Sequence, residues 1–190
     1  SCLRFLHEAG CDLGQTGSEG RTPACMAAWN GHEACLRVMM DAGCDLEQAT
    51  DYGDTPAHEA AECGNDGCLL VMKAAGCSLG QARDNGETPA YMAAQNGHEG
   101  CLRLLIDAGC NVDKSDNYGK TPAYMAAHYD QEACLRLLKE SGCDLGQANS
   151  YGWTPANRAA FCGNEGCLRL LKEAGCDLEQ VDRFGQTPAY

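Results

Sequence analysis

The sequence predicts an all-α fold, a linear solenoid in which helix-turn-helix units stack side by side and β-hairpin-like loops join them. Three observations support this prediction. The dipeptide Thr-Pro recurs six times at a constant spacing of 33 residues, from Thr22 to Thr187. Two cysteine series keep the same period, one from Cys2 to Cys167 and the other from Cys11 to Cys176. Because no insertion interrupts these three registers, a repeated structural unit explains them better than chance.

The first helix of each unit is predicted to start at the Thr-Pro pair. In the third unit, Thr88 suits the N-cap position and Pro89 suits the first helical position. Small residues, among them Ala93, then give this helix a face that allows close packing. The pair Asn96-Gly97 ends the helix.

A second helix is predicted through Cys101 and the leucines that follow, and it ends at Gly109. The chain then extends through residues 111–113 and enters a polar turn before the next unit. Isolated helices shorter than about 12 residues are marginal in water. The stability of both helices must therefore come from stacking one unit on the next.

The segments from Gly86 to Ala94 and from Asn96 to Val112 resemble the ankyrin repeat. The consensus of that repeat reads G-x-T-P-L-H-x-A-A, then N-G-H, a Leu-rich helix and G-A-D-V-N. The resemblance covers nearly the whole chain and implies a single domain over residues 1–190, which we expect to be a fragment of a longer protein. It divides the chain into a partial unit 1–15, five full units 16–48, 49–81, 82–114, 115–147 and 148–180, and a partial unit 181–190.

The departures from the consensus are systematic. The Leu after Thr-Pro is Ala in every unit, the consensus His is kept only as His58, and the Ala after the helix-ending Gly is always Cys. We interpret the Ala and Cys changes as matched, with smaller residues on one helix packing against larger ones nearby.

The net charge of the chain is −13, from 27 acidic and 14 basic residues, and few basic residues cluster. This composition argues against binding to nucleic acid or to an anionic membrane surface. No stretch approaches the roughly 18 consecutive apolar residues of a membrane span. The residues that follow Ser1 show no signal-peptide pattern. We expect a protein partner, in particular a basic one, or other subunits of a larger assembly, with no nucleic acid and no direct membrane insertion.

The chain holds 15 cysteines, an odd number, and has no Asn-x-Ser/Thr glycosylation signal. Both facts favour an intracellular protein with reduced thiols, cytoplasmic in the first instance and organellar as the alternative. The periodic cysteines are expected to be small core residues. Neighbouring helices lie roughly 8–10 Å apart, whereas a disulfide needs Cα atoms within about 7 Å, so equivalent cysteines of adjacent units should not pair.

Three cysteines fall outside the periodic series. The resemblance places Cys25, Cys63 and Cys162 at or near the solvent-facing side of the first helix. Cys63 with Cys68, and Cys162 with Cys167, have a C-x4-C spacing. This spacing leaves three interpretations open: free thiols, a disulfide in an oxidising setting, or a zinc site, which would need four ligands where only two recur.

No catalytic residue, cofactor or metal ligand is predicted. A nucleophile and a base must lie within hydrogen-bond reach, yet Cys25 and His58 hold the same position in successive units, about 10 Å apart. His32 and His98 fall where other units have Asn or Gln, so we expect them to brace the turn through hydrogen bonds.

The resemblance implies that the loop tips and the exposed end of the first helix line a concave face that binds partners. These positions vary most between units, and many carry aromatic side chains, which bury much area at low entropy cost. The alternative is that the tip aromatics only pack on neighbouring loops. The predicted partner-binding residues are Trp29, Tyr52, Asp54, Glu62, Glu87, Tyr118, Lys120, His128, Tyr151, Trp153, Phe161 and Phe184.

The expected function is that of a protein-protein interaction module or of a peripheral scaffold subunit. The alternative is a non-catalytic segment of a larger enzyme whose active site lies outside these residues.

Overall fold

The computed structural model describes residues 13–183 and 185. Within this part of the chain there are ten α-helices, one short 3-10 helix and no strand. Phe184, one of the predicted partner-binding residues, lies outside the described residues. The helices are η1 (Ser18–Gly20), α2 (Pro23–Trp29), α3 (Glu33–Asp41), α4 (Pro56–Cys63), α5 (Asp66–Ala74), α6 (Pro89–Asn96), α7 (Glu99–Asp107), α8 (Pro122–His128), α9 (Glu132–Glu140), α10 (Pro155–Cys162) and α11 (Glu165–Glu173).

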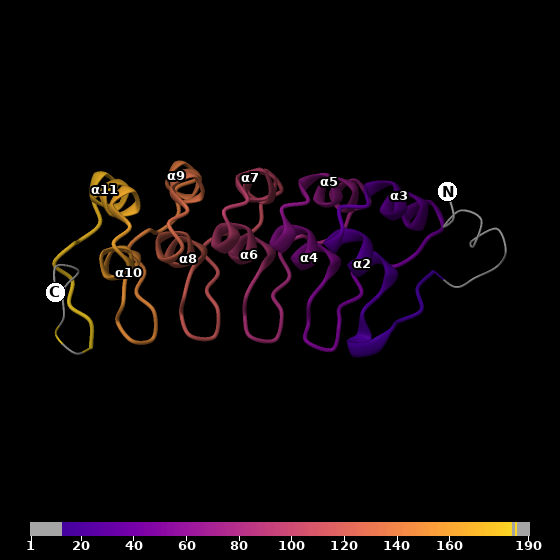
Figure 1. The fold of residues 1–190 in the computed structure, drawn as a ribbon, viewed down its shortest axis with the longest axis horizontal. Helices are drawn as coiled ribbons and strands as arrows, with labels where there is room; N and C mark the ends of the chain where they lie inside the picture. The colour runs from indigo at the N-terminus through magenta and orange to yellow at the C-terminus, as the bar shows by residue number, and fades with distance from the viewer. Residues whose placement is uncertain (1–12, 184, 186–190) are drawn as a thin grey trace.

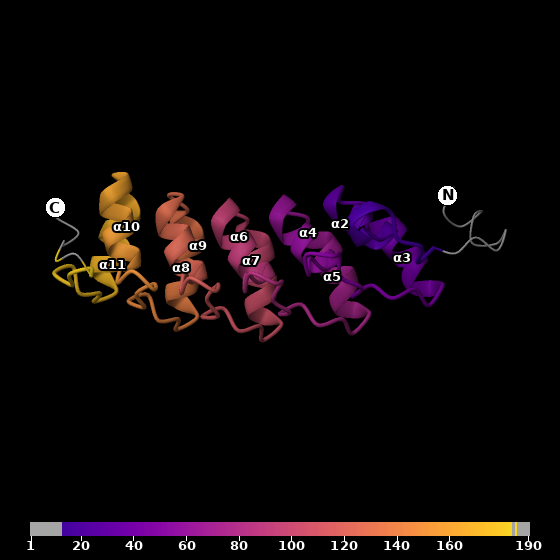
Figure 2. The same ribbon diagram turned by 90° about the horizontal axis from the view of Figure 1, so that it is seen from below.

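The helices form two layers that run the length of the molecule (Figure 1). The first helix of each unit, α2, α4, α6, α8 or α10, packs on the first helix of the next unit, and the second helices pack in the same way. The loops between units project from the layer of first helices, and the pairs α2–α3 and α10–α11 lie at opposite ends of the array. Seen from below, successive helix pairs lie side by side, with the loops at the same end of each pair (Figure 2). The structure is therefore the predicted all-α solenoid.

The Thr-Pro pairs start the first helices as predicted. The hydroxyl of Thr88 accepts a hydrogen bond from the backbone N–H of Tyr91 at 3.2 Å, and Thr121 and Thr154 make the equivalent bond at 3.1 Å. The proline that follows occupies the first turn, where its missing N–H costs nothing. These threonines are buried, so their hydroxyls satisfy N–H groups that water does not reach.

The first helices end in left-handed residues. Gly64, Gly97 and Gly163 have φ values of 76°, 76° and 75° at the C-caps of α4, α6 and α10. The fourth unit has Asp130 at this position, with φ of 58°. A side chain costs free energy in this conformation, so Asp130 is a strained exception to the glycine pattern.

The core consists of the alanines of the first helices and the leucines of the second, which form one continuous cluster along the array. The first cysteine series belongs to this core. Cys68, Cys101, Cys134 and Cys167 are buried free thiols, and each points to a first-helix carbonyl of the preceding unit, as Cys101 does to Ala60 at 3.9 Å. Burial raises the pKa of Cys68 to about 11 and the pKa of Cys101 to about 12. The prediction that the periodic cysteines act as small core residues is confirmed for these four. The other described members of the two series are only partly buried and pack against the edge of the core: Cys35, Cys44, Cys77, Cys110, Cys143 and Cys176. Cys2 and Cys11 lie outside the described residues.

The placement predicted for Cys25 is wrong. Cys25 is 1% exposed, and its thiol points to the carbonyl oxygen of Gln48 at 3.9 Å, on the segment that leads to the next unit. The third residue of the first helix faces this segment and not the solvent. Cys63 is half-buried and Cys162 is exposed, and both carry free thiols.

Side-chain bridges join neighbouring units at the start of each second helix. Asn65 donates hydrogen bonds to the carbonyls of Ala28 and Trp29 at 2.8 and 2.9 Å, and His98 donates to Glu62 at 2.9 Å. The predicted bracing role of His98 is confirmed, although the bond reaches back to the preceding unit. The same bridge recurs from Gln131 and Asn164. Within the described residues, His32 has no hydrogen bond of this kind.

The loops are hairpin-like turns that also bond to one another. We number each loop by the full unit that it begins. Across the fourth loop, residues 115–120, the N–H of Asp116 donates to the carbonyl of Lys120 at 2.9 Å. Between neighbouring loops the N–H of Asn117 donates to Asn85 at 2.9 Å, and the N–H of Ser150 donates to Tyr118 at 2.8 Å. The loop tips therefore form a continuous hydrogen-bonded row. No helix in the described part has the length and apolar content to cross a bilayer.

Candidate functional site

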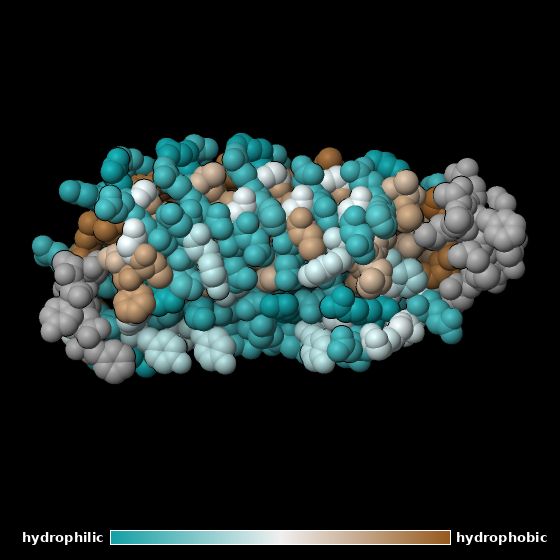
Figure 3. Space-filling view, viewed as in Figure 1, coloured by the Kyte–Doolittle hydropathy of each residue, from teal (hydrophilic) through white to brown (hydrophobic). Residues whose placement is uncertain are grey.

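The loop tips and the exposed side of the first helices meet at an angle along the whole array, and we call this surface the inner face (Figures 1 and 2). The described residues that the sequence predicts for partner binding belong to the loops between units, except for four near the ends of the first helices: Trp29, Glu62, His128 and Phe161. The long side of the molecule in Figure 3 is largely hydrophilic, with pale ring-bearing side chains along its lower edge, where the loops lie. Tyr52, Tyr118 and Tyr151 at the tips are 59%, 56% and 52% exposed, so neighbouring loops do not bury them.

A buried polar side chain at the base of the loop holds the tip in the second, fourth and fifth loops, which are residues 49–54, 115–120 and 148–153. The Oδ1 atom of Asn149 accepts hydrogen bonds from the backbone N–H groups of Tyr151 and Trp153 at 2.9 and 3.0 Å. Asp116 holds its own tip in the same way, at 2.9 and 2.8 Å. Both side chains are buried. The backbone that carries the exposed aromatics is therefore fixed before any partner arrives.

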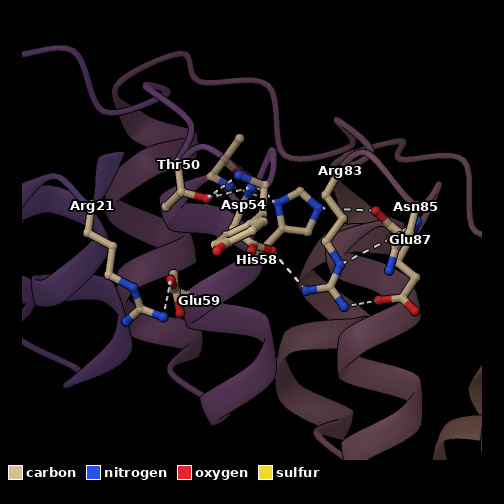
Figure 4. Close-up of polar contacts among 10 residues, drawn as sticks. Arg21, Thr50, Asp54, His58, Glu59, Arg83, Asn85 and Glu87 are labelled. Carbon is tan, nitrogen blue, oxygen red and sulfur yellow. Dashed lines mark hydrogen bonds and ion pairs between the residues drawn. The ribbon is translucent and has the colours of Figure 1, made fainter. Parts of the chain in front are cut away.

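The third loop breaks this pattern. Arg83 stands where the second, fourth and fifth loops have Thr, Asp and Asn. It forms ion pairs with Asp54 at 2.9 Å and with Glu87 (Figure 4). Asn85 takes over the support of the tip and accepts the N–H of Glu87 at 3.1 Å. Two of the predicted acidic contact residues, Asp54 and Glu87, thus share one half-buried cation, Arg83, which offsets part of their charge.

The first half of the inner face keeps an acidic excess. Glu59 is 4% exposed, and its carboxylate lies 4.0 Å from the guanidinium of Arg21. Burial raises the pKa of Glu59, and Arg21 opposes this shift. Arg21 also lies over the ring of Trp29, 6.0 Å from its centroid. Glu62 stands half-buried one turn further along α4.

His58 is a structural residue. Its Nδ1 atom accepts hydrogen bonds from the N–H and the hydroxyl of Thr55 at 3.1 and 2.9 Å, and its Nε2–H donates to the carbonyl of Glu87 at 3.2 Å (Figure 4). Burial lowers the pKa of His58 to about 4. Burial also raises the pKa of the Cys25 thiol. Neither shift suits a nucleophile and a base that act at neutral pH.

A cationic and aromatic cluster occupies the other end of the inner face. The guanidinium of Arg158 lies 5.6 Å from the ring centroid of Trp153 and 5.2 Å from that of Phe161, and the two rings meet edge to face at 5.4 Å. Its Nε–H donates to Nδ1 of His128 at 2.8 Å. Burial lowers the pKa of His128, and the charges of Arg158 and Lys120 lower it further.

The structure brings together His128, Trp153 and Phe161, which the sequence predicts as separate contact positions. The ammonium of Lys120 lies 5.7 Å from the ring centroid of Tyr118, and its charge helps to lower the pKa of His128. Sequence reasoning missed Arg158, which joins His128, Trp153 and Phe161. Two signals mark it: the equivalent residue is Met in three other units, and Phe161 follows three residues later, on the same side of the helix.

The described residues contain no group of three or more His, Cys, Asp or Glu side chains that could hold a metal ion. The two C-x4-C pairs offer at most two thiols each, and Cys68 and Cys167 belong to the core. The inner face therefore offers charge, aromatic area and fixed loops, which suit binding to another surface.

Comparisons with known proteins agree with this architecture. A family model described as ankyrin repeats (3 copies) matches residues 1–82 and 68–149. The crystal structure of the human ASB11 ankyrin repeat domain is 25% identical, with a TM-score of 0.90, over 98% of this chain and 83% of that chain. The ankyrin repeat domain of Bcl-3, a unique member of the IkappaB protein family, is 20% identical, with a TM-score of 0.84, over 98% and 84%. No curated protein sequence matches the chain.

Proposed function

This chain belongs to the ankyrin repeat family, whose repeats are general protein-interaction modules, and on that premise we propose that it binds a protein partner through its inner face. We propose no catalytic step for the described residues, and we propose that units 16–48 to 148–180 act together as one intracellular domain. The observation that carries the proposal is the row of exposed tyrosines on loop tips fixed by buried polar side chains.

Fixed tips lower the entropy cost of association. A partner that packs on Tyr52, Tyr118 and Tyr151 gains aromatic contact area without ordering a mobile loop. Because the three tyrosines belong to loops joined by backbone hydrogen bonds, they present one extended edge. A partner segment that runs along the array would contact them in turn.

The charge of the first half of the inner face supports a basic partner segment there. Arg83 balances one of the two charges on Asp54 and Glu87, whereas Glu62 and the exposed Asp51 have no such cation among the described residues. A net charge of −13 adds long-range attraction for a basic partner, and salt would weaken it.

The test is a triple variant, Tyr52→Ala, Tyr118→Ala and Tyr151→Ala, assayed against a partner captured by pull-down. Truncation of a hot-spot residue costs about 2 kcal/mol or more, so affinity should fall at least roughly 30-fold. Exposed substitutions change fold stability by under about 0.5 kcal/mol each, so the variant should melt near the parent temperature.

The matched control is Leu70→Ala, which removes an exposed apolar side chain from the second helix α5, outside the inner face. It should leave the affinity unchanged. If the triple variant binds as tightly as the parent, or if the control loses more affinity, the interface lies on the second helices or at the ends of the array.

A further inference from the structure

Arg158 has an unusual setting for an arginine of this chain. The equivalent positions hold Met26, Glu59, Met92 and Met125, so only the fifth of the full units places a cation here. Two aromatic rings and an imidazole contact its guanidinium, with distances of 5.2 and 5.6 Å to the ring centroids and 2.8 Å from Nε to His128. These contacts fix the plane of the guanidinium before any ligand binds.

No carboxylate within residues 13–183 and 185 forms an ion pair with Arg158 or with Lys120. Two other arginines of the inner face have a carboxylate partner, Arg21 with Glu59 at 4.0 Å and Arg83 with Asp54 at 2.9 Å. Among the described residues, Arg158 and Lys120 therefore lack the carboxylate partner that Arg21 and Arg83 have.

Asp116, the buried acid at the base of the fourth loop (residues 115–120), already has hydrogen-bond partners. The Oδ1 atom of Asp116 accepts the backbone N–H groups of Tyr118 and Lys120, and Oδ2 accepts the hydroxyl of Tyr91 at 3.3 Å. Asp116 is buried, so it cannot swing out to neutralise Arg158 without releasing the loop tip. The positive charge is therefore left for a group from outside the described residues.

We propose that Lys120, His128 and Arg158 form a carboxylate-binding cradle on the inner face, which takes an Asp or Glu side chain of the protein partner. The proposal rests on the proposed function, since it assumes that the partner lies on this face. His128 occupies the edge of the guanidinium formed by Nε and Nη2, through Nδ1 at 2.8 Å and Nε2 at 3.2 Å. The N–H groups on the opposite edge, of Nη1 and Nη2, remain as a fork that matches a carboxylate. Trp153 and Phe161 flank the site with apolar surface, which strengthens the ion pair by excluding water.

A carboxylate suits the cradle better than a phosphate. A carboxylate brings one negative charge toward a chain of net charge −13, whereas a phosphate brings nearly two, so the repulsion from the rest of the chain favours the carboxylate. The partner would then be basic where it meets the first half of the inner face and acidic where it meets the cradle. This pairing of opposite charges fixes the direction in which the segment binds.

The experiment uses three acetylated and amidated pentapeptides that differ only in two positions: Gly-Glu-Phe-Glu-Gly, its Gln counterpart and its phosphoserine counterpart. Binding is followed by NMR at the side-chain Nε–Hε of Arg158 and at the ring of His128. The Glu peptide should bind saturably and raise the pKa of His128, because it neutralises the two cations that lower it. The Gln peptide should do neither.

The variant Arg158→Met restores the residue of three other units, so it should fold. It should weaken binding of the Glu peptide roughly tenfold or more. The control Arg103→Gln removes an arginine of α7 that is paired with Glu99 at 2.8 Å, and it should leave binding unchanged.

Equal binding of the Glu and Gln peptides, or no shift at Arg158 and His128, would overturn the cradle. Tighter binding of the phosphoserine peptide than of the Glu peptide would replace the carboxylate by a phosphate. Neither result depends on the tyrosine variant. If the Glu peptide does not bind but the tyrosine triple variant still loses affinity for the partner, only the cradle is refuted and the proposed function stands.

Discussion

Acidification is expected to destabilise this protein through one buried imidazole, that of His58. Its pKa is about 4 in the folded chain, against 6.5 for an unburied histidine, because burial disfavours the charged form. Between these values the unfolded chain binds a proton that the folded chain does not. Folding stability from this group is therefore complete above pH 6.5, falls as the pH drops toward 4 and is flat below that.

The size of the effect follows from the pKa difference. A pKa difference of one corresponds to about 1.36 kcal/mol, so the whole difference for His58 amounts to about 3 kcal/mol of folding stability. About 2 kcal/mol of this stability is lost by about pH 5. The chain supplies its own matched variant. In the last full unit Asn157 accepts the N–H and hydroxyl of Thr154 at 2.8 and 2.7 Å and donates to Gln180 at 3.3 Å. His58→Asn should therefore keep the helix cap and lose the titration.

Urea unfolding of the parent and of His58→Asn, followed by circular dichroism at pH 7.5 and 5, measures the effect. Contributions from carboxylates are common to both proteins and cancel in the comparison. The parent should lose about 2 kcal/mol more than the variant between the two pH values. His32→Asn, a change at an exposed histidine, should behave as the parent does. Equal losses in the parent and in His58→Asn would refute the reasoning.

Three further predictions concern the scaffold. Deletion of residues 148–180 should lower the urea midpoint in a graded way, because repeat stability is a sum of unit and interface contributions, and complete loss of helicity would contradict the stacking. Thiol titration in denaturant without reductant should count close to all 15 cysteines, and a melting temperature that falls with reductant would reveal a disulfide. Asp130→Gly should stabilise the protein by about 1 kcal/mol, because it relieves a φ of 58°. An unchanged urea midpoint would mean that the contact of Asp130 with Cys167 at 3.7 Å offsets the strain.

The helices could be predicted from sequence because their start and stop signals are local. The first helix of the third unit runs from Pro89 to Asn96, between the predicted cap and the predicted stop. The second helix begins at Glu99, before the apolar run that predicted it from Cys101, because an acidic residue is favourable in a first turn without adding apolar pattern.

The burial of Cys25 could not be read from variation between units. Its position holds Cys, His, Tyr, Tyr and Asn in successive full units, and such variety resembles a surface. All five residues are buried, however, and the interactions of their side chains differ: Asn157 bonds Gln180, whereas Tyr91 bonds Asp116 at 3.3 Å. Variation at this position reflects different polar partners and not exposure.

The charge pairing of the inner face was also beyond the sequence. Arg83 meets Asp54 across 29 residues, and Arg158 meets His128 across 30, so each contact depends on how units stack. A period of 33 residues shows which positions are equivalent, but it does not show with which side chains of the neighbouring units a long side chain will form an ion pair or a hydrogen bond.

If the two ends of the array are pulled apart, the interfaces between units should differ in the force that they resist. Asn65 bridges the first and second full units with two hydrogen bonds, and Asn164 does the same between the fourth and fifth. His98 makes one bond of 2.9 Å, and Gln131 makes one of 3.4 Å. Under tension the interface at Gln131, between the third and fourth full units, should therefore open first. The array would then separate into a block of three units and a block of two. A partner that lies along the inner face would contact units on both sides of this interface and would hold them together.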